Sequence, residues 1–144
     1  MIPPVGGLRL FLVDDHPGFL RALTGFLEAA DGLAVVGSVT RGAEAVLKIG
    51  ELRPDVVLVD LLMPGLPGLE IIPRLRAARP EMGIIALTLL ETDDYRRAAL
   101  TAGADDFVTK ATMDTTLVPA IRRVARARGL GAAMESAPGT ESRG

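Results

Sequence analysis

The 144-residue sequence contains no cysteine, which excludes disulfide bonds and thiolate chemistry. No apolar run approaches the roughly 20 residues that a membrane-spanning helix requires, and the first residues do not have the form of a signal peptide. A basic excess is also missing, because the formal net charge is -2, so the domain has no overall electrostatic footprint for nucleic acid. We therefore expect a cytoplasmic protein with no direct contact to membrane or nucleic acid.

Lysine and histidine are scarce as well. Lysine occurs only at positions 48 and 110, and nearly all the remaining positive charge is arginine. This rarity makes Lys110, which follows the predicted strand at 106–109, a candidate for a functional cation. His16, the only histidine, stands just before Pro17 and is interpreted as a residue at the start of a helix.

Short apolar stretches alternate with amphipathic stretches along residues 1–128, which we treat as one domain. Strands are predicted at 9–13, 33–39, 56–59, 83–88 and 106–109. Helices are predicted from Pro17, over 42–52 and 69–78, from a cap at Asp93 or Asp94 to Gly103, and up to about Arg128. This alternation predicts an α/β fold, a doubly wound, flavodoxin-like, five-stranded parallel sheet in the order 2-1-3-4-5 with five helices. Residues 129–144 are rich in Gly, Ala, Ser, Pro and Glu and are predicted to be a disordered tail.

The start of the last helix is a separate prediction, based on Pro119. Inside a helix, proline removes one N–H and costs about 3 kcal/mol, whereas in the first turn it costs almost nothing. We therefore expect this helix to begin near Leu117, with Thr116 as its cap and residues 111–115 as a loop.

The third predicted strand ends at Asp60 and is followed by a loop rich in proline and glycine. Asp14 and Asp15 end the first strand, Thr88 ends the fourth, and Lys110 follows the fifth. In a doubly wound sheet these positions share the edge at the carboxyl ends of the strands. Clustered carboxylates repel one another, and Mg²⁺ is the cation whose ligand preferences suit them best. Asp60 is then a candidate nucleophile, Lys110 a charge for phosphoryl oxygens, and Thr88 a hydroxyl donor.

Together these residues resemble a response-regulator receiver domain, the phosphoacceptor half of two-component signalling. The resemblance covers about residues 8–128. The segments 13–17 and 102–105 resemble the LuxR/NarL-type subfamily, which usually carries a DNA-binding output domain. The matching positions are Asp14 and Asp15 (acidic pair), Asp60 (phosphoacceptor), Thr88 and Phe107 (switch residues), Lys110 (lysine), and Met63, Pro64 and Gly68 in the loop after Asp60.

The resemblance implies that Asp60 takes a phosphoryl group from a sensor histidine kinase or a phosphotransfer protein. Mg²⁺ would be held by Asp15, Asp60 and the backbone carbonyl of Leu62, with Asp14 helping through water. Thr88 and Phe107 would switch the surface of the fourth helix, fifth strand and fifth helix, through which receivers dimerise or bind a downstream protein. The chain would not be an enzyme beyond catalysing its own phosphorylation and dephosphorylation.

Three alternatives stay open. The chain can be a pseudo-receiver that binds partners without phosphate, or a flavodoxin-like cofactor binder, although Asp14 and Asp15 would repel a cofactor phosphate. It can also be the receiver fragment of a longer DNA-binding regulator. We favour a stand-alone receiver, because sixteen tail residues cannot form a helix-turn-helix domain. The arginines of the last helix are interpreted as a solvated face favoured by the helix dipole, at positions 122, 123, 126 and 128.

Overall fold

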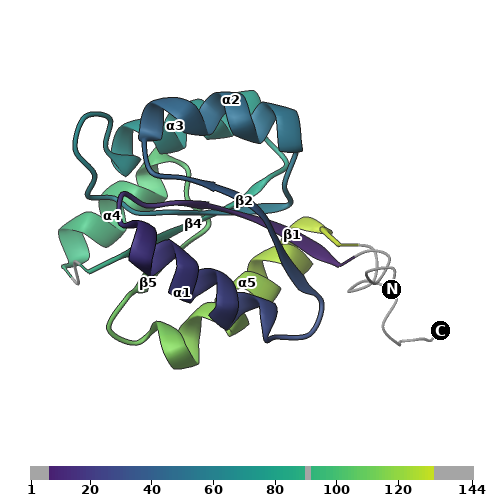
Figure 1. Ribbon diagram of the computed structural model, residues 1–144. Coiled ribbons are helices and arrows are strands. Elements are labelled where there is room, and N and C mark those ends of the chain that lie inside the picture. The colour runs from purple at the N-terminus through teal and green to yellow at the C-terminus, as the bar shows by residue number, and fades with distance from the viewer. Residues whose placement is uncertain (1–6, 90–91, 132–144) are drawn as a thin grey trace.

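Five parallel strands form a single sheet in the order β2-β1-β3-β4-β5 in the computed structural model, which describes residues 7–89 and 92–131 (Figure 1). The strands are β1 (Leu8–Val13), β2 (Leu33–Val39), β3 (Val56–Val59), β4 (Gly83–Thr88) and β5 (Asp106–Thr109). The helices are α1 (Pro17–Glu28), α2 (Gly42–Leu52), α3 (Gly68–Ala78), α4 (Asp93–Ala102) and α5 (Met113–Arg128). The predicted fold class is therefore confirmed. No helix within these residues is long and apolar enough to cross a membrane.

Helices cover both faces of the sheet, with α1 and α5 on one side and α2, α3 and α4 on the other (Figure 1). The central strand β3 is buried along its whole length, and its side chains point alternately into two hydrophobic cores, one on each face of the sheet. Val57 and Val59 pack toward α2 and α3, whereas Val56 and Leu58 pack toward α1 and α5. Burial on both faces explains why this strand is continuously apolar.

The fourth helix begins differently from the prediction. Thr92 is its N-cap, and its Oγ1 accepts a hydrogen bond from the Tyr95 N–H at 3.3 Å. Asp93 and Asp94 lie in the first turn, where the helix dipole favours negative charge. The predicted cap at Asp93 or Asp94 is therefore wrong by one residue. The predicted end is confirmed, since Gly103 follows the helix with a φ of 126°.

The last helix begins four residues earlier than predicted. It starts at Met113, after Thr112, and Pro119 lies inside it. The Thr112 carbonyl accepts the N–H groups of Thr115 and Thr116 at 3.1 and 3.2 Å, and the Thr116 hydroxyl at 3.0 Å. These bonds close a first turn without the predicted Thr116 cap, so residues 113–115 are helical instead of a loop. Gly129 ends the helix with a φ of 67°, whereas the predicted tail lies mostly outside the described residues.

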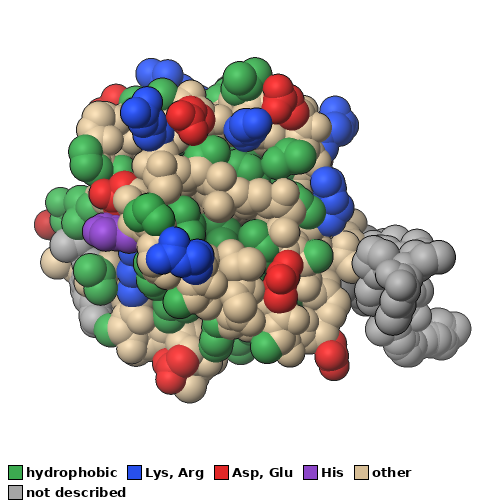
Figure 2. All heavy atoms as spheres, in the orientation of Figure 1, with side chains coloured by type: hydrophobic (Ala, Val, Ile, Leu, Met, Phe, Trp, Pro, Cys, Tyr) green, Lys and Arg blue, Asp and Glu red, His purple; other side chains and the backbone are tan. Residues whose placement is uncertain are grey.

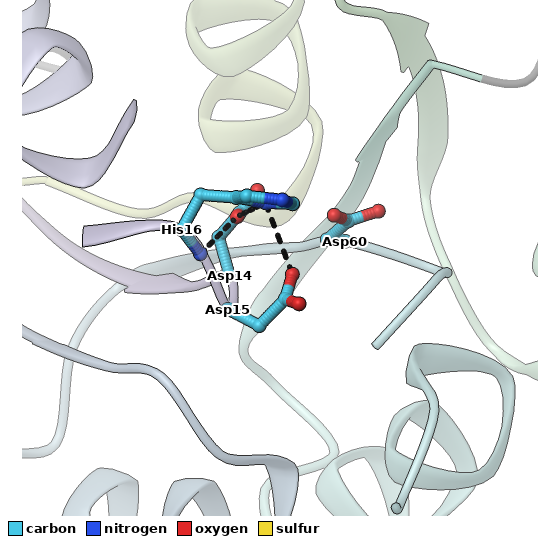
Figure 3. Close-up of side chains that lie close together, drawn as sticks. All are labelled: Asp14, Asp15, His16 and Asp60. Atoms are coloured by element: carbon cyan, nitrogen blue, oxygen red, sulfur yellow. Dashed lines mark hydrogen bonds and ion pairs between the residues drawn. The ribbon is translucent and has the colours of Figure 1, made fainter. Parts of the chain in front are cut away.

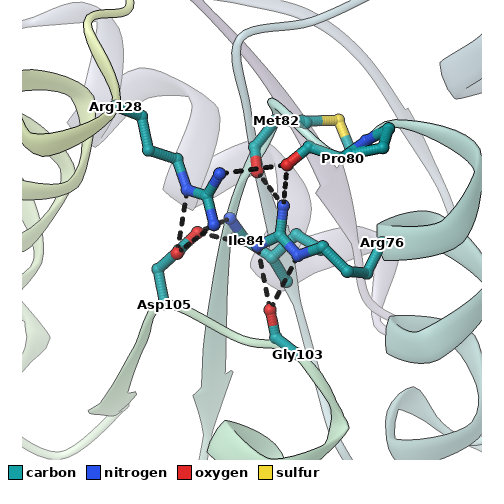
Figure 4. A network of polar contacts seen from close by, with 7 residues as sticks. All are labelled: Arg76, Pro80, Met82, Ile84, Gly103, Asp105 and Arg128. Atoms are coloured by element: carbon teal, nitrogen blue, oxygen red, sulfur yellow. Dashed lines mark hydrogen bonds and ion pairs between the residues drawn. The ribbon is translucent and has the colours of Figure 1, made fainter.

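A network of polar contacts closes the edge of the sheet opposite the carboxyl ends of the strands (Figure 4). Arg76 on α3 donates to the Gly103 carbonyl at 2.8 Å and to Asp105 at 3.0 Å. Arg128 at the end of α5 donates to the other Asp105 oxygen at 2.8 Å. The interpretation of Arg128 as part of a solvated face is therefore wrong. Its side chain is 28% exposed and ties α5 to the start of β5.

Gly68, the first residue of α3, permits a close approach to the end of β3. A Cβ atom at this position would lie 2.2 Å from the Asp60 carbonyl oxygen. Any side chain here would push α3 away from the residue that ends the central strand.

We expect Gly68→Ala to lower the free energy of unfolding by about 1–3 kcal/mol, because backbone atoms must move to admit the methyl group. Gly25→Ala is the matched control, since a Cβ there meets nothing within 4 Å and Gly25 lies within α1. It should raise stability by roughly 0.8–1 kcal/mol through helix propensity. Urea denaturation of both variants measures the difference, and equal effects would show that the approach at Gly68 carries no strain.

Candidate functional site

Three polar or charged side chains are buried among the described residues, namely Asp14, Asp60 and Thr88. All three lie at the carboxyl edge of the sheet, as predicted. The sheet hydrogen bonds fix their backbones: the Asp14 N–H donates to Val39, and the Asp60 N–H donates to Val13 at 2.9 Å. The carboxylates thus leave the ends of two adjacent strands, β1 and β3.

Lys110 connects these two carboxylates. Its Nζ lies 2.6 Å from Asp14 Oδ2 and 3.2 Å from Asp60 Oδ2, and its side chain is 8% exposed. The Lys110 N–H donates to the Thr88 carbonyl at 2.7 Å, which fixes the turn after β5 to the end of β4. The structure therefore brings Asp14, Asp60, Thr88 and Lys110 together, as the sequence analysis expected.

Asp14, Asp15, His16 and Asp60 form an acidic cluster at the same edge (Figure 3). Ligand atoms of Asp14, Asp15, His16 and Asp60 all lie within 4.8 Å of one another. His16 Nδ1 is 3.1 Å from one oxygen of Asp14 and 3.1 Å from one oxygen of Asp15. The Asp15 oxygen in this contact, Oδ1, is enclosed, and apart from the contact with His16 it has no hydrogen-bond partner among the described residues. Three carboxylates whose ligand atoms lie this close together fit a hard divalent cation such as Mg²⁺.

Burial raises the pKa of the Asp60 carboxyl above its ordinary value of 3.8. The Leu62 N–H, which donates to Asp60 Oδ1 at 3.1 Å, and the Lys110 ammonium act in the opposite direction, while Asp14 raises the pKa further. Because the balance is a raised pKa, the folded protein disfavours the charged form of Asp60.

The remaining predicted residues lie around this centre. Phe107 on β5 is 4% exposed, and the Arg96 guanidinium lies 5.0 Å from the centroid of its ring. Leu62 is 46% exposed at the start of the loop after β3, and its N–H rather than its side chain contacts Asp60.

The sequence analysis missed two aromatic–cation contacts at or near the site. One is between Arg96 and Phe107, and in the other the Lys110 ammonium lies 4.1 Å from the ring centroid of Phe19. Neither pair has a recognisable sequence spacing, because each joins different elements of the fold.

The acidic edge is accessible from outside. His16 is exposed, and the space-filling view shows it at the surface beside an acidic side chain (Figure 2). An open hollow of about 500 Å³ adjoins Asp15 and is lined also by Thr40, Arg41 and Pro64. A donor molecule therefore has room to approach the cluster.

The doubly wound sheet, its acidic edge and the buried lysine define a receiver-type α/β domain. The family model for the response regulator receiver domain matches residues 10–122, and the chain belongs to this family. It is 40% identical over 117 residues to the response regulator GacA of Pseudomonas viridiflava, covering 81% of this chain and 55% of that protein. The chain thus spans about half the length of the curated relatives it matches.

Solved structures agree with this assignment. A LuxR-family two-component response regulator from Aurantimonas sp. superimposes with a TM-score of 0.81 at 32% identity, covering 84% of this chain and 86% of that one. The receiver domain of the putative response regulator NarL from Mycobacterium tuberculosis gives a TM-score of 0.78 at 28% identity, covering 85% and 98%. The predicted resemblance to LuxR/NarL-type receivers is confirmed.

Asp60→Asn should make the metal-free protein more stable at neutral pH, because it removes a charge that burial penalises. Since the pKa of Asp60 is raised in the folded state, its ionised form costs stability above that pKa. The advantage of the variant should therefore shrink as the pH falls and Asp60 takes up a proton. Urea denaturation between pH 3 and 7 tests this, with the exposed Asp31→Asn as control. Higher stability of the unsubstituted protein at pH 7 would contradict it.

Adding Mg²⁺ should stabilise the unsubstituted protein by about 2.7 kcal/mol at a concentration 100 times its dissociation constant, with a smaller gain in Asp60→Asn. Urea denaturation at pH 7, repeated at increasing Mg²⁺ concentrations in buffer without calcium, measures this gain. An equal gain in both proteins would place the cation elsewhere.

Proposed function

We propose that the chain is a phosphoacceptor module that takes a phosphoryl group onto Asp60 in a Mg²⁺-dependent reaction. The observation that carries this proposal is the placement of every buried polar side chain of the described residues at one edge, around Asp60. A fold that needed only stability would have little reason to bury two carboxylates side by side. A sensor histidine kinase or a phosphotransfer protein is the donor proposed for this receiver, in the cytoplasm.

The chemistry assigned to Asp60 is nucleophilic attack on phosphorus. An oxygen of Asp60 forms the O–P bond, the P–N bond of the donor breaks, and its electron pair returns to the imidazole, which takes up a proton. Lys110 would move from the Asp60 oxygen to an oxygen of the transferred group, where it neutralises charge. Asp14, Asp15, Asp60 and the Leu62 carbonyl would hold Mg²⁺, which when bound supplies further positive charge to the phosphoryl oxygens.

The same residues support a role as a switch. The Thr88 hydroxyl would bond the new phosphoryl group, and Phe107, on the neighbouring strand, would change its position in response. Since the Arg96 guanidinium lies over the Phe107 ring, a movement of this ring would reach α4. The surface of α4, β5 and α5 is therefore the proposed site for dimerisation or for a downstream protein.

Incubation with Mg²⁺ and a small acyl phosphate should add one phosphoryl group to the protein, visible as a single mass increase. Asp60→Asn should abolish the labelling, because no other carboxylate ends β3. Asp31→Asn, which changes an exposed carboxylate, should label normally. Labelling of Asp60→Asn, or labelling that EDTA leaves unchanged, would contradict the assignment of Asp60 and the metal.

A phosphate-independent pseudo-receiver is the competing proposal, and the same experiment separates the two. The relative lengths favour one further possibility, since the chain covers 55% of the first matched response regulator. In that case the receiver would control an output domain of a longer regulator. An immunoblot of the protein from its native cells would then show a product about one and a half times the 15.1 kDa of this chain, since 117 residues make up 55% of that regulator.

Binding of beryllofluoride, a phosphoryl mimic, should change amide hydrogen exchange in α4, β5 and α5, over residues 92–126. We expect contacts of Tyr95, Arg122, Arg123 and Arg126 to respond, because they lie on or beside this surface. Arg123 already bonds Asp106 on β5 at 2.7 Å. The control is Asp60→Asn with the same mimic, which should show no change. Changes confined to Asp14, Asp15 and Asp60 would contradict the proposed surface.

A further inference from the structure

The ring of Phe19 is an unexpected partner of the buried lysine. Phe19 lies in the first turn of α1, which begins at Pro17 directly after the acidic residues of the β1–α1 loop. Its side chain is partly buried against the core between the sheet, α1 and α5. The Lys110 Nζ lies 4.1 Å from the centroid of the ring, within the distance at which an ammonium is attracted to an aromatic face.

The lysine ammonium thus has three neighbours of two kinds. Two are carboxylates, Asp14 at 2.6 Å and Asp60 at 3.2 Å, and the third is the neutral ring of Phe19. The gap enclosed by Phe19, Asp14, Asp60 and the apolar side chains around them is too small to hold a water molecule. The ring and the two carboxylate partners of the cation are thus packed together without room for water between them.

We propose that Phe19 is a positioning residue that holds the Lys110 ammonium in place for phosphoryl transfer. This inference rests on the proposed function of Asp60. As the O–P bond forms, the negative charge on the Asp60 side of the lysine shifts from the carboxylate to the oxygens of the transferred group, while Asp14 keeps its charge. The attraction of the ring does not depend on that charge and persists through the reaction. Phe19 would then keep the ammonium directed at the transferred group while its carboxylate partner changes.

A purely structural role for Phe19 makes a different prediction. Phe26 lies on the same helix, seven residues further along, and is also partly buried against the same core. If Phe19 only filled space, replacing either phenylalanine by leucine would have similar consequences. If Phe19 positions Lys110, only its replacement affects the reaction, and an aromatic substitute preserves it.

The test compares Phe19→Leu, Phe19→Tyr and Phe26→Leu, with urea denaturation to confirm that each is folded. The rate of Asp60 phosphorylation by a small acyl phosphate and the affinity for beryllofluoride are measured with Mg²⁺. We expect both to fall about tenfold in Phe19→Leu, the change that corresponds to losing a partly desolvated cation–π contact. Phe19→Tyr and Phe26→Leu should stay close to the unsubstituted protein. Equal values in all four proteins, or equal losses in Phe19→Leu and in either other variant, would overturn the inference.

A second readout does not depend on phosphorylation. Because the chain contains only two lysines, lysine labelled with ¹³C at Cε gives two signals, with the exposed Lys48 as internal reference. The ring of Phe19 should shift the Lys110 ε-protons upfield, and the shift should persist in Phe19→Tyr and disappear in Phe19→Leu. An unshifted Lys110 signal in the unsubstituted protein would overturn the contact itself. A shifted signal in a protein that never labels at Asp60 would overturn the proposed function while leaving the contact intact.

Discussion

The site depends on an excess of negative charge at the edge of the sheet. One buried ammonium, Lys110, contacts two buried carboxylates, Asp14 and Asp60. A third carboxylate, Asp15, lies beside them, with His16 Nδ1 3.1 Å from its Oδ1. A single cation does not neutralise this cluster. Burial raises the pKa of Asp60, and Asp14 adds to this effect. The charge imbalance accounts for the fit of the site to a divalent cation. It also leaves Lys110 shared between carboxylates, so that it can transfer to a new anion.

The fold holds these carboxylates close together through backbone hydrogen bonds of the sheet rather than by giving each carboxylate its own cation. Asp60 continues the hydrogen bonding between β1 and β3, and Lys110 continues that between β4 and β5. Gly68 lets α3 approach the end of β3, where a side chain would collide with the Asp60 carbonyl. At the opposite edge, Arg76 and Arg128 satisfy both oxygens of Asp105. The carboxylate at that edge has two cationic partners, whereas at the acidic edge two carboxylates share one lysine.

The sequence was sufficient to predict what depends on local pattern. Alternating apolar stretches predicted the strand order, and strand ends predicted the convergence of Asp14, Asp60, Thr88 and Lys110. The sequence was insufficient for contacts between elements that are distant along the chain. It was also insufficient where small local effects of opposite sign decide where a helix begins. The helix α5 starts at Met113, with hydrogen bonds to the Thr112 carbonyl in its first turn, although it contains Pro119, and the pairing of Arg128 depends on a residue more than twenty positions away. Phe19 escaped notice because a phenylalanine near a helix start has no pattern that distinguishes it from a core residue.

Two contacts show how a charge placed on Asp60 can be felt at a distance. Lys110 directly follows β5, and its N–H donates to the carbonyl of Thr88, so the cation, the end of β4 and the strand that carries Phe107 are connected. Phe107 in turn lies beneath the Arg96 guanidinium of α4. Each cation thus contacts an aromatic ring, whose attraction does not require a charged partner. If Asp60 is phosphorylated as proposed, such a partner keeps its attraction for Lys110 while the charge on Asp60 changes.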